Sequence, residues 1–221
     1  MQLLSVGRAQ SVWLFDANDL NPRGRYIFPD LIEWLKEEGQ FEVFPKSPDD
    51  LDETKGLAFK RGSFPLGNED LTVELTLYND GVIANTYSST KATDIFIENT
   101  LTNAAQEFDL KYGTDLIRSK THLSEIVVRM EKELGVLNPK LSDFAKRISE
   151  AYGHSWANPF EVGGISFWSD TSLSALKAAP FALERKVNVA FSEHRYFSRA
   201  PLHTDDHFKL LEEFEQILAA P

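Results

Sequence analysis

Hydrophobic and polar residues alternate most regularly between positions 71 and 78. The apolar residues at every second position are Leu71, Val73, Leu75 and Leu77. A period of two places them on one face of a β-strand, with the polar residues on the other face. The turn residues Asn79-Asp80-Gly81 follow, and a second apolar run continues to Ser88. The pattern therefore predicts an antiparallel hairpin over Leu71–Ser88 with one buried face.

The length of the turn decides which side chains of this hairpin face each other. A two-residue Asp-Gly loop would place Leu77 opposite Ala84. A three-residue loop, with Gly81 left-handed in a bulge, would place Leu77 opposite Ile83 and Val73 opposite Tyr87. We expect the three-residue loop, because it pairs apolar residues with apolar residues across the strands.

Helical spacing of apolar residues appears in four other segments. The expected helices are Pro29–Glu38, Thr90–Phe108, Pro139–Tyr152 and Asp205–Ala219. The third has the strongest end signals: Asn138 is a good N-cap, Pro139 suits the first helical position, and Gly153 suits the end. Leu141, Phe144 and Ile148 would form part of its apolar face.

Short runs of strand-forming residues account for much of the remaining chain. The expected strands are Ser11–Phe15, Phe41–Phe44, Gly56–Phe59, Ser124–Glu131, Val162–Trp168 and Phe181–Phe191. We interpret the basic and aromatic segment Arg195–Pro201 as a packed connector; the alternative is a contact for acidic or stacked groups of a partner. Strands and helices do not alternate strictly, which favours an α+β fold, mainly an antiparallel sheet with amphipathic helices packed on it. We expect a single domain over residues 1–221, with a soft boundary near 134–139.

Charge then limits the class of partner. The 221 residues carry 34 Asp and Glu against 23 Lys and Arg, a formal net charge of −11. Such a balance opposes general nucleic-acid binding, which requires clustered basic residues. The acidic residues are spread out, with one concentration at Asp49–Glu53. This segment is either a solvated loop or a contact for a protein partner with a basic surface.

Composition also bears on location and chemistry. The sequence contains no cysteine, which excludes disulfides, thiolate metal sites and a thiol nucleophile. No apolar run approaches the roughly 20 residues that span a bilayer, and the first residues do not read as a secretory signal. We therefore expect a cytoplasmic protein that makes no membrane contact.

The densest group of possible metal ligands is His203-Thr-Asp-Asp-His207. His203, Asp206 and His207 could bind one metal ion if the two histidines, four apart, shared a helix face. The segment lacks the Glu of the H-E-x-x-H pattern and crosses an expected helix start. The alternative is structural: Thr204 caps the helix, and acidic residues of its first turn interact with the helix dipole.

A second group combines Asp170 with Glu184 and Lys186. Residues two apart on a strand point to the same side, so Glu184 and Lys186 would share a face. With Asp170 nearby they could hold Mg²⁺ and position a water for phosphodiester cleavage. The group resembles the acid and E-x-K pattern of restriction-type nucleases. The alternative is a solvated sheet face on which Glu and Lys form cross-strand pairs.

Two functions are compatible with these features. The first is a non-catalytic subunit or adaptor that acts through protein–protein contacts in a cytoplasmic assembly and needs no cofactor. The second is a metal-dependent hydrolase, for example a phosphodiesterase or nuclease, that uses either Asp170, Glu184 and Lys186 as catalytic residues or the cluster His203–His207. A divalent metal is expected only in the second case. The acidic balance, the abundant aromatic residues and the lack of a coherent catalytic motif favour the first.

Overall fold

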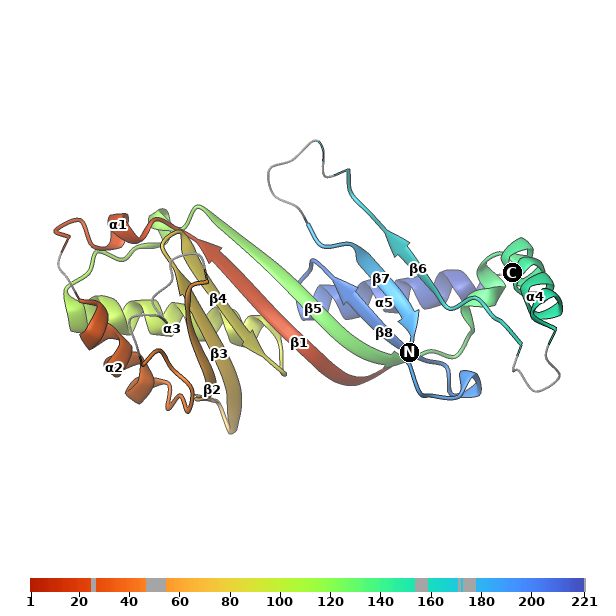
Figure 1. Ribbon diagram of the computed structural model, residues 1–221, viewed down its shortest axis with the longest axis horizontal. Helices are drawn as coiled ribbons and strands as arrows, with labels where there is room; N and C mark the ends of the chain where they lie inside the picture. The colour runs from red at the N-terminus through yellow and green to blue at the C-terminus, as the bar shows by residue number, and fades with distance from the viewer. Residues whose placement is uncertain (25–26, 47–54, 154–158, 171, 173–177, 221) are drawn as a thin grey trace. The chain divides into compact units, whose positions relative to one another are not determined.

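The computed structural model describes the chain except for residues 25–26, 47–54, 154–158, 171, 173–177 and 221 (Figure 1). The expected acidic loop Asp49–Glu53 therefore lies outside the described residues. The chain divides into two compact units, which we call unit 1 and unit 2. Unit 1 contains Met1–Ser5, Glu125–Pro201 and Asp205–Pro221. Unit 2 contains Val6–Ser124 and Leu202–Thr204.

The strands form an eight-stranded sheet in the order β2-β3-β4-β1-β5-β8-β7-β6. Their bounds are β1 Gln2–Leu14, β2 Leu57–Leu66, β3 Glu69–Tyr78, β4 Gly81–Thr86, β5 Ser119–Arg129, β6 Gly164–Phe167, β7 Phe181–Arg185 and β8 Arg195–Ala200. The pairs β1–β4, β2–β3, β3–β4, β6–β7 and β7–β8 are antiparallel. The α+β class with an antiparallel sheet is confirmed.

Helices accompany the strands in both units. The α-helices are α1 Ala17–Leu20, α2 Phe28–Glu38, α3 Thr90–Phe108, α4 Pro139–Tyr152 and α5 Thr204–Ala219. The short 3₁₀ helices are η2 Thr114–Leu116, η3 Leu134–Leu137 and η5 Phe191–Glu193. Among the described residues, no helix has the length and apolar content needed to cross a membrane. The four expected helices are present, with ends within one residue of the prediction.

The end signals of α4 act as the sequence indicates. The Asn138 side chain accepts a hydrogen bond from the Lys140 backbone N–H at 3.0 Å, which satisfies one free donor at the start of the helix. Pro139 follows in the first turn. Gly153 ends the helix in a left-handed conformation with φ +67°, which glycine adopts at little cost.

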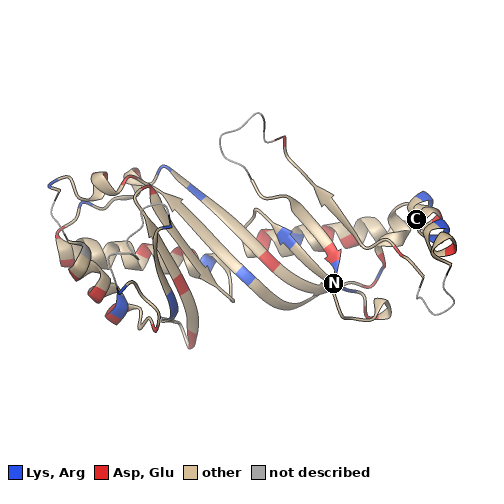
Figure 2. Ribbon diagram, viewed as in Figure 1, with Lys and Arg blue, Asp and Glu red and all other residues tan. Residues whose placement is uncertain are grey.

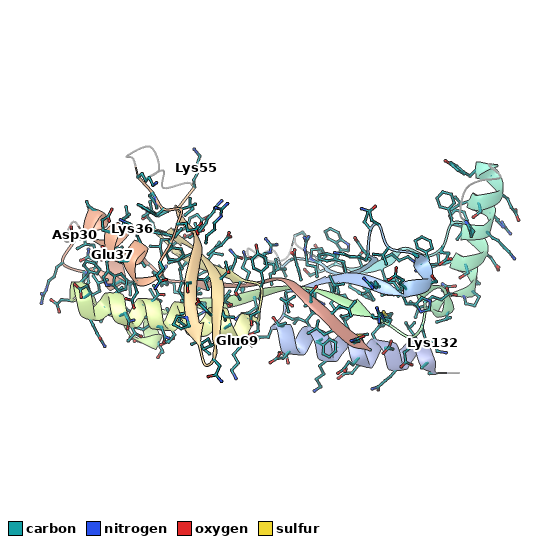
Figure 3. The ribbon with its side chains drawn as sticks, turned by 90° about the horizontal axis from the view of Figure 1, so that it is seen from below. Asp30, Lys36, Glu37, Lys55, Glu69 and Lys132 are labelled. Atoms are coloured by element: carbon teal, nitrogen blue, oxygen red, sulfur yellow. The ribbon has the colours of Figure 1, made fainter. Side chains whose placement is uncertain are left out.

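Unit 2 has a large hydrophobic core between its sheet and helices α2 and α3. Its buried members are Trp13, Phe15, Leu20, Leu35, Phe41, Leu57, Phe59, Val73, Leu75, Val82, Ala84, Phe96 and Ile97. Leu35 of α2 enters this core, whereas Asp30 and Glu37 of the same helix are exposed (Figure 3). The polar and apolar sides of α2 thus follow its sequence pattern.

The Leu71–Ser88 hairpin forms, but the three-residue turn was wrong. Tyr78 pairs with Gly81, so the loop is the two residues Asn79 and Asp80, and Leu77 faces Val82. Neighbouring strand β1 sets this register. A Cβ atom on Gly81 would lie 2.3 Å from the Trp13 carbonyl oxygen, so only glycine permits the close approach of β1.

The segment Arg195–Pro201 was also interpreted wrongly, because residues 195–200 form the strand β8. Tyr196, Ser198 and Ala200 are its buried positions at a period of two. The expected strand Phe41–Phe44 is reduced to an isolated bridge between Val43 and Lys60. Strand β7 ends at Arg185, so the expected strand to Phe191 is too long.

Unit 1 has its own buried residues on β5, β7, β8 and α5. These include Val128, Leu183, Tyr196, Leu211 and Leu218. His207 of α5 contacts both neighbouring strands of this unit: its ring lies 5.7 Å from the Phe181 ring, and its Nε2 lies 2.8 Å from the Ser198 Oγ. Helix α5 therefore packs on β7 and β8 through an apolar face that includes one buried histidine.

Candidate functional site

Three possible metal ligands come together in unit 2. Asp94 lies on α3, His122 on β5, and His203 just before α5. One ligand atom from each side chain lies within 4.8 Å of the other two. We call these three residues the Asp94 cluster. Asp94 and His122 are partly buried, whereas His203 is exposed, so the cluster is open to solvent on one side.

Asp94 is the most heavily bonded member. Its Oδ1 accepts a hydrogen bond from the Trp13 indole N–H at 2.9 Å, and its Oδ2 lies 3.0 Å from the His122 Nε2. Burial raises the pKa of this carboxyl, but hydrogen bonds from His122, Ser11 and Trp13 outweigh burial and lower the pKa to about 2. Asp94 is therefore a carboxylate with fixed orientation across the physiological pH range.

The two histidines lie ring on ring. Their centroids are 3.6 Å apart, and their planes are inclined by 32°. The Nδ1 of His203 lies 3.2 Å from the Thr90 hydroxyl oxygen, which also accepts the Thr204 backbone N–H at 2.9 Å. If Nδ1 carries the proton, it donates to Thr90 and leaves the Nε2 lone pair of His203 for another partner.

A cation–π contact supports the tryptophan behind Asp94. The Lys120 Nζ lies 3.3 Å from the centroid of the Trp13 ring. Trp13 is otherwise buried in the unit 2 core, so its indole N–H has a fixed direction toward Asp94. The carboxylate is thus oriented by a residue of the core rather than by a mobile surface side chain.

The sequence indicated His203 as a ligand, but with different companions. His207 is fully buried against Ser198, and burial lowers its pKa to about 4. Asp206 is exposed in the first turn of α5. Within the described part of the chain, the ligand group that contains His203 includes Asp94 and His122 and neither Asp206 nor His207.

Asp170, Glu184 and Lys186 are all exposed. The Asp170 Oδ1 accepts hydrogen bonds from the Ser172 hydroxyl at 2.6 Å and the Ser172 backbone N–H at 2.9 Å, which lower the pKa of Asp170. Glu184 lies on β7 opposite Gly164 and Phe197. Lys186 follows that strand, and its backbone N–H donates to the Arg195 carbonyl. These three residues are outside the described group of three ligands.

Asp94 and His122 carry no motif that could have identified them. They are 28 residues apart, on a helix and a strand, and His203 is far from both in the sequence. Only His203 belonged to a dense run of possible ligands. Lone histidines and aspartates on separate elements become recognisable as a group only when the fold is known.

A different feature distinguishes helix α4 of unit 1: its apolar face is exposed. The exposed fractions are 46% for Leu141, 60% for Phe144, 37% for Ile148, 50% for Tyr152 and 45% for the neighbouring Phe160. The rings of Tyr152 and Phe160 meet edge to face at 5.7 Å. We call these five residues the α4 surface. Ala145 is the buried residue of the helix.

Charged side chains line one side of the α4 surface. Lys140 and Arg147 lie four residues before and three residues after Phe144, so both flank it on the helix. Both are exposed, as are Asp143 and Glu150, which lie farther round the helix. Figure 2 shows both signs of charge on α4. The immediate flank of the apolar face is therefore basic, although the whole chain is acidic.

Comparisons with known proteins identify no relative in sequence. No family model matches the chain. No curated protein matches it either. A solved structure described as Methanococcus jannaschii TBP is similar over 99% of this chain and 97% of that chain, with a TM-score of 0.45 and 11% identity. At this TM-score and identity the similarity assigns neither a family nor a function.

Proposed function

We propose that this chain is a non-catalytic subunit or adaptor that binds another protein through the α4 surface. The supporting observation is the exposure of Leu141, Phe144 and Ile148 at helical spacing on one face. An amphipathic helix in a globular protein normally turns such a stripe toward the core. The cytoplasmic assembly expected from the sequence belongs to the same proposal.

The exposed apolar area of the α4 surface favours binding to another protein. Removing apolar surface from water is favourable by roughly 25 cal/mol for each Å² buried. Aromatic side chains are enriched in protein interfaces and dominate their energetics. The α4 surface contains three aromatic rings: Phe144, Tyr152 and Phe160. Contiguous exposed apolar residues with polar neighbours are typical of interaction sites.

The basic flank indicates the chemistry of the partner. Lys140 and Arg147 would meet acidic side chains at the edge of an apolar contact. The net charge of −11 favoured a basic partner, but the charge beside Phe144 is positive. We therefore propose a partner segment with an apolar stripe and an acidic edge at this surface. A basic surface on the same partner could face the acidic remainder of the chain.

Site-specific photocrosslinking tests this proposal. A photoreactive amino acid at position 144, in cells that make the chain at its natural level, is expected to capture one defined protein. The matched control carries the same group at position 217, because Ile217 is also an exposed apolar residue on a helix, 64% exposed. Mass spectrometry of the crosslinked peptides should show apolar and acidic residues in the partner segment captured from position 144.

A substitution then tests whether Phe144 contributes to the affinity for the captured partner. Phe144→Ser should weaken binding of the captured partner by at least about tenfold, as expected for an aromatic residue near the centre of an interface. Ile217→Ser should leave it unchanged. Raising the salt concentration should slow association, because screening weakens the attraction to Lys140 and Arg147. The same captured proteins at both positions, or full binding by the Phe144→Ser chain, would contradict the proposal.

We keep the metal-dependent hydrolase as a second proposed function for one reason. The Asp94 cluster offers two imidazoles and a carboxylate, and a metal ion with three protein ligands retains a position for water or substrate. Asp170, Glu184 and Lys186 lie in unit 1, so they stay a separate proposed catalytic group for that function and are not partners of the Asp94 cluster. Measuring phosphodiester hydrolysis by the untagged chain with added Mg²⁺, Mn²⁺ or Zn²⁺ tests it, and the absence of turnover with all three would contradict it.

A further inference from the structure

We propose that Asp94, His122 and His203 bind a divalent transition-metal ion, with zinc as the best-suited ion. The site lies in unit 2, whereas the α4 surface lies in unit 1, so this inference does not depend on the adaptor proposal. It also places His203 with two ligands that are distant in the sequence.

The donor set selects the class of ion. Two imidazole nitrogens and one carboxylate oxygen suit zinc and neighbouring transition metals, whereas Mg²⁺ and Ca²⁺ prefer oxygen ligands alone. Zinc sites with two histidines and one carboxylate are well known as a coordination type. The cluster contains this set, with all three ligand atoms within 4.8 Å of one another.

Small side-chain movements would bring the ligands to bonding distance. Zinc bonds of about 2.1 Å in a tetrahedron require ligand atoms about 3.4 Å apart. The three ligand atoms lie within 4.8 Å of one another, so they must approach each other by up to about 1.4 Å. His203 is exposed, so a small shift of its ring displaces no core residue. The Asp94 Oδ2 and the His122 Nε2 already lie 3.0 Å apart, and a metal ion would replace the proton between them. Two of the three ligands are thus close to the required spacing.

Other side chains hold the ligands in place. Trp13 donates to the Oδ1 of Asp94 at 2.9 Å, and the Thr90 hydroxyl lies 3.2 Å from the Nδ1 of His203. A hydrogen bond to one ring nitrogen fixes the histidine and leaves the other nitrogen to bind metal. Such second contacts around metal ligands typically contribute about 10–100-fold to metal affinity. Trp13 makes such a contact with Asp94, and Thr90 makes one with His203.

Zinc titration of the untagged, metal-free full-length chain tests this inference by isothermal titration calorimetry. We expect one zinc ion per chain with a dissociation constant below about 10 μM. His203→Gln should weaken binding at least about tenfold, since losing a ligand costs no less than losing a second contact. Because His203 is exposed, this variant should fold normally, which circular dichroism checks. His122→Gln and Asp94→Asn should weaken binding similarly.

Two matched variants serve as controls. Asp205→Asn makes the same change as Asp94→Asn at an exposed carboxylate two residues from His203, and His194→Gln removes a histidine of unit 1. Both should bind zinc as the unchanged chain does. No zinc binding by the unchanged chain at about 100 μM, or equal affinity of the His203→Gln chain, would overturn the inference. The three side chains would then form only a hydrogen bond and a ring stack.

Discussion

Several buried polar side chains in this protein are paired with partners that the sequence does not reveal. His207 is fully buried and bonds to Ser198, nine residues earlier on β8. Thr90 and Thr204 bond reciprocally, each backbone N–H donating to the other hydroxyl at 3.0 and 2.9 Å. Burying such groups is tolerated because they are hydrogen bonded. The burial of His207 also makes the stability of the fold depend on pH.

His207 should make the protein less stable in mild acid. Burial lowers its pKa from 6.5 to about 4, so the unfolded chain binds a proton at this position before the folded chain does. Its contribution is present above pH 6.5 and is lost as the pH falls from 6.5 through 4. The linked loss is up to about 1.4 kcal/mol of unfolding free energy per pH unit in that range.

Urea unfolding between pH 7.5 and 4.5 measures this effect. His207→Gln can still bond to the Ser198 hydroxyl but cannot take up the proton, so its unfolding free energy should fall less steeply with acid than that of the unchanged chain. His194→Gln is the control, because His194 is partly exposed. Equal slopes for the unchanged and His207→Gln chains would show that His207 does not titrate with folding.

At the scale of elements, periodicity and end signals predicted the helices well. Helix α3 begins after Ser89, whose hydroxyl accepts the Ala92 N–H at 3.1 Å, and α4 begins after Asn138 as expected. These signals are local, so one sequence is enough to recognise them. Strand β8 was missed because a serine and an alanine occupy two of its three buried positions. Ser198 is acceptable there because its hydroxyl donates to the Ala182 carbonyl at 2.8 Å and also bonds to His207.

Hairpin register depended on a third strand and was therefore predicted wrongly. Cross-strand matching of Leu77 with Ile83 considered β3 and β4 alone, whereas the backbone of β1 packs against Gly81. The Phe15 backbone N–H also donates to the Asp80 carbonyl at 3.0 Å, which fixes the two-residue turn. The Asp94 cluster was not predicted either, because its members lie on separate elements that only the fold brings together.

Replacing Gly81 by alanine should destabilise the hairpin strongly. The added Cβ would lie 2.3 Å from the Trp13 carbonyl oxygen, which is backbone and cannot move aside easily. Overpacking of this kind costs about 1–3 kcal/mol. Gly163→Ala is the matched control, because a Cβ there meets nothing within 4 Å, and surface changes of this kind stay within about 0.5 kcal/mol. Chemical denaturation of both variants gives the comparison, and equal stabilities would argue against the register described here.

At the scale of the whole molecule, each of the two compact units has buried residues among those that the structure describes. The large cluster that contains Trp13, Phe59 and Phe96 belongs entirely to unit 2. Leu183 and Leu211 are fully buried in unit 1. Hydrophobic patterning indicates which residues are buried, but it does not indicate which of them share a core. A single domain over residues 1–221 therefore stays a prediction, and hydrogen-exchange measurements can test it.

Separate cores should unfold separately under native conditions. Leu211→Ala leaves a cavity in unit 1, a change that costs about 2–5 kcal/mol, and should speed hydrogen exchange of backbone amides in β7 and β8. Amides of β3 and β4 should keep their rates. Phe59→Ala in unit 2 should give the reverse pattern, and Ile217→Ala, at a position 64% exposed, should change neither. Mass spectrometry of exchanged peptides resolves the two regions. If either core variant accelerated both regions equally, the chain would behave as one cooperative domain, as its sequence alone suggested.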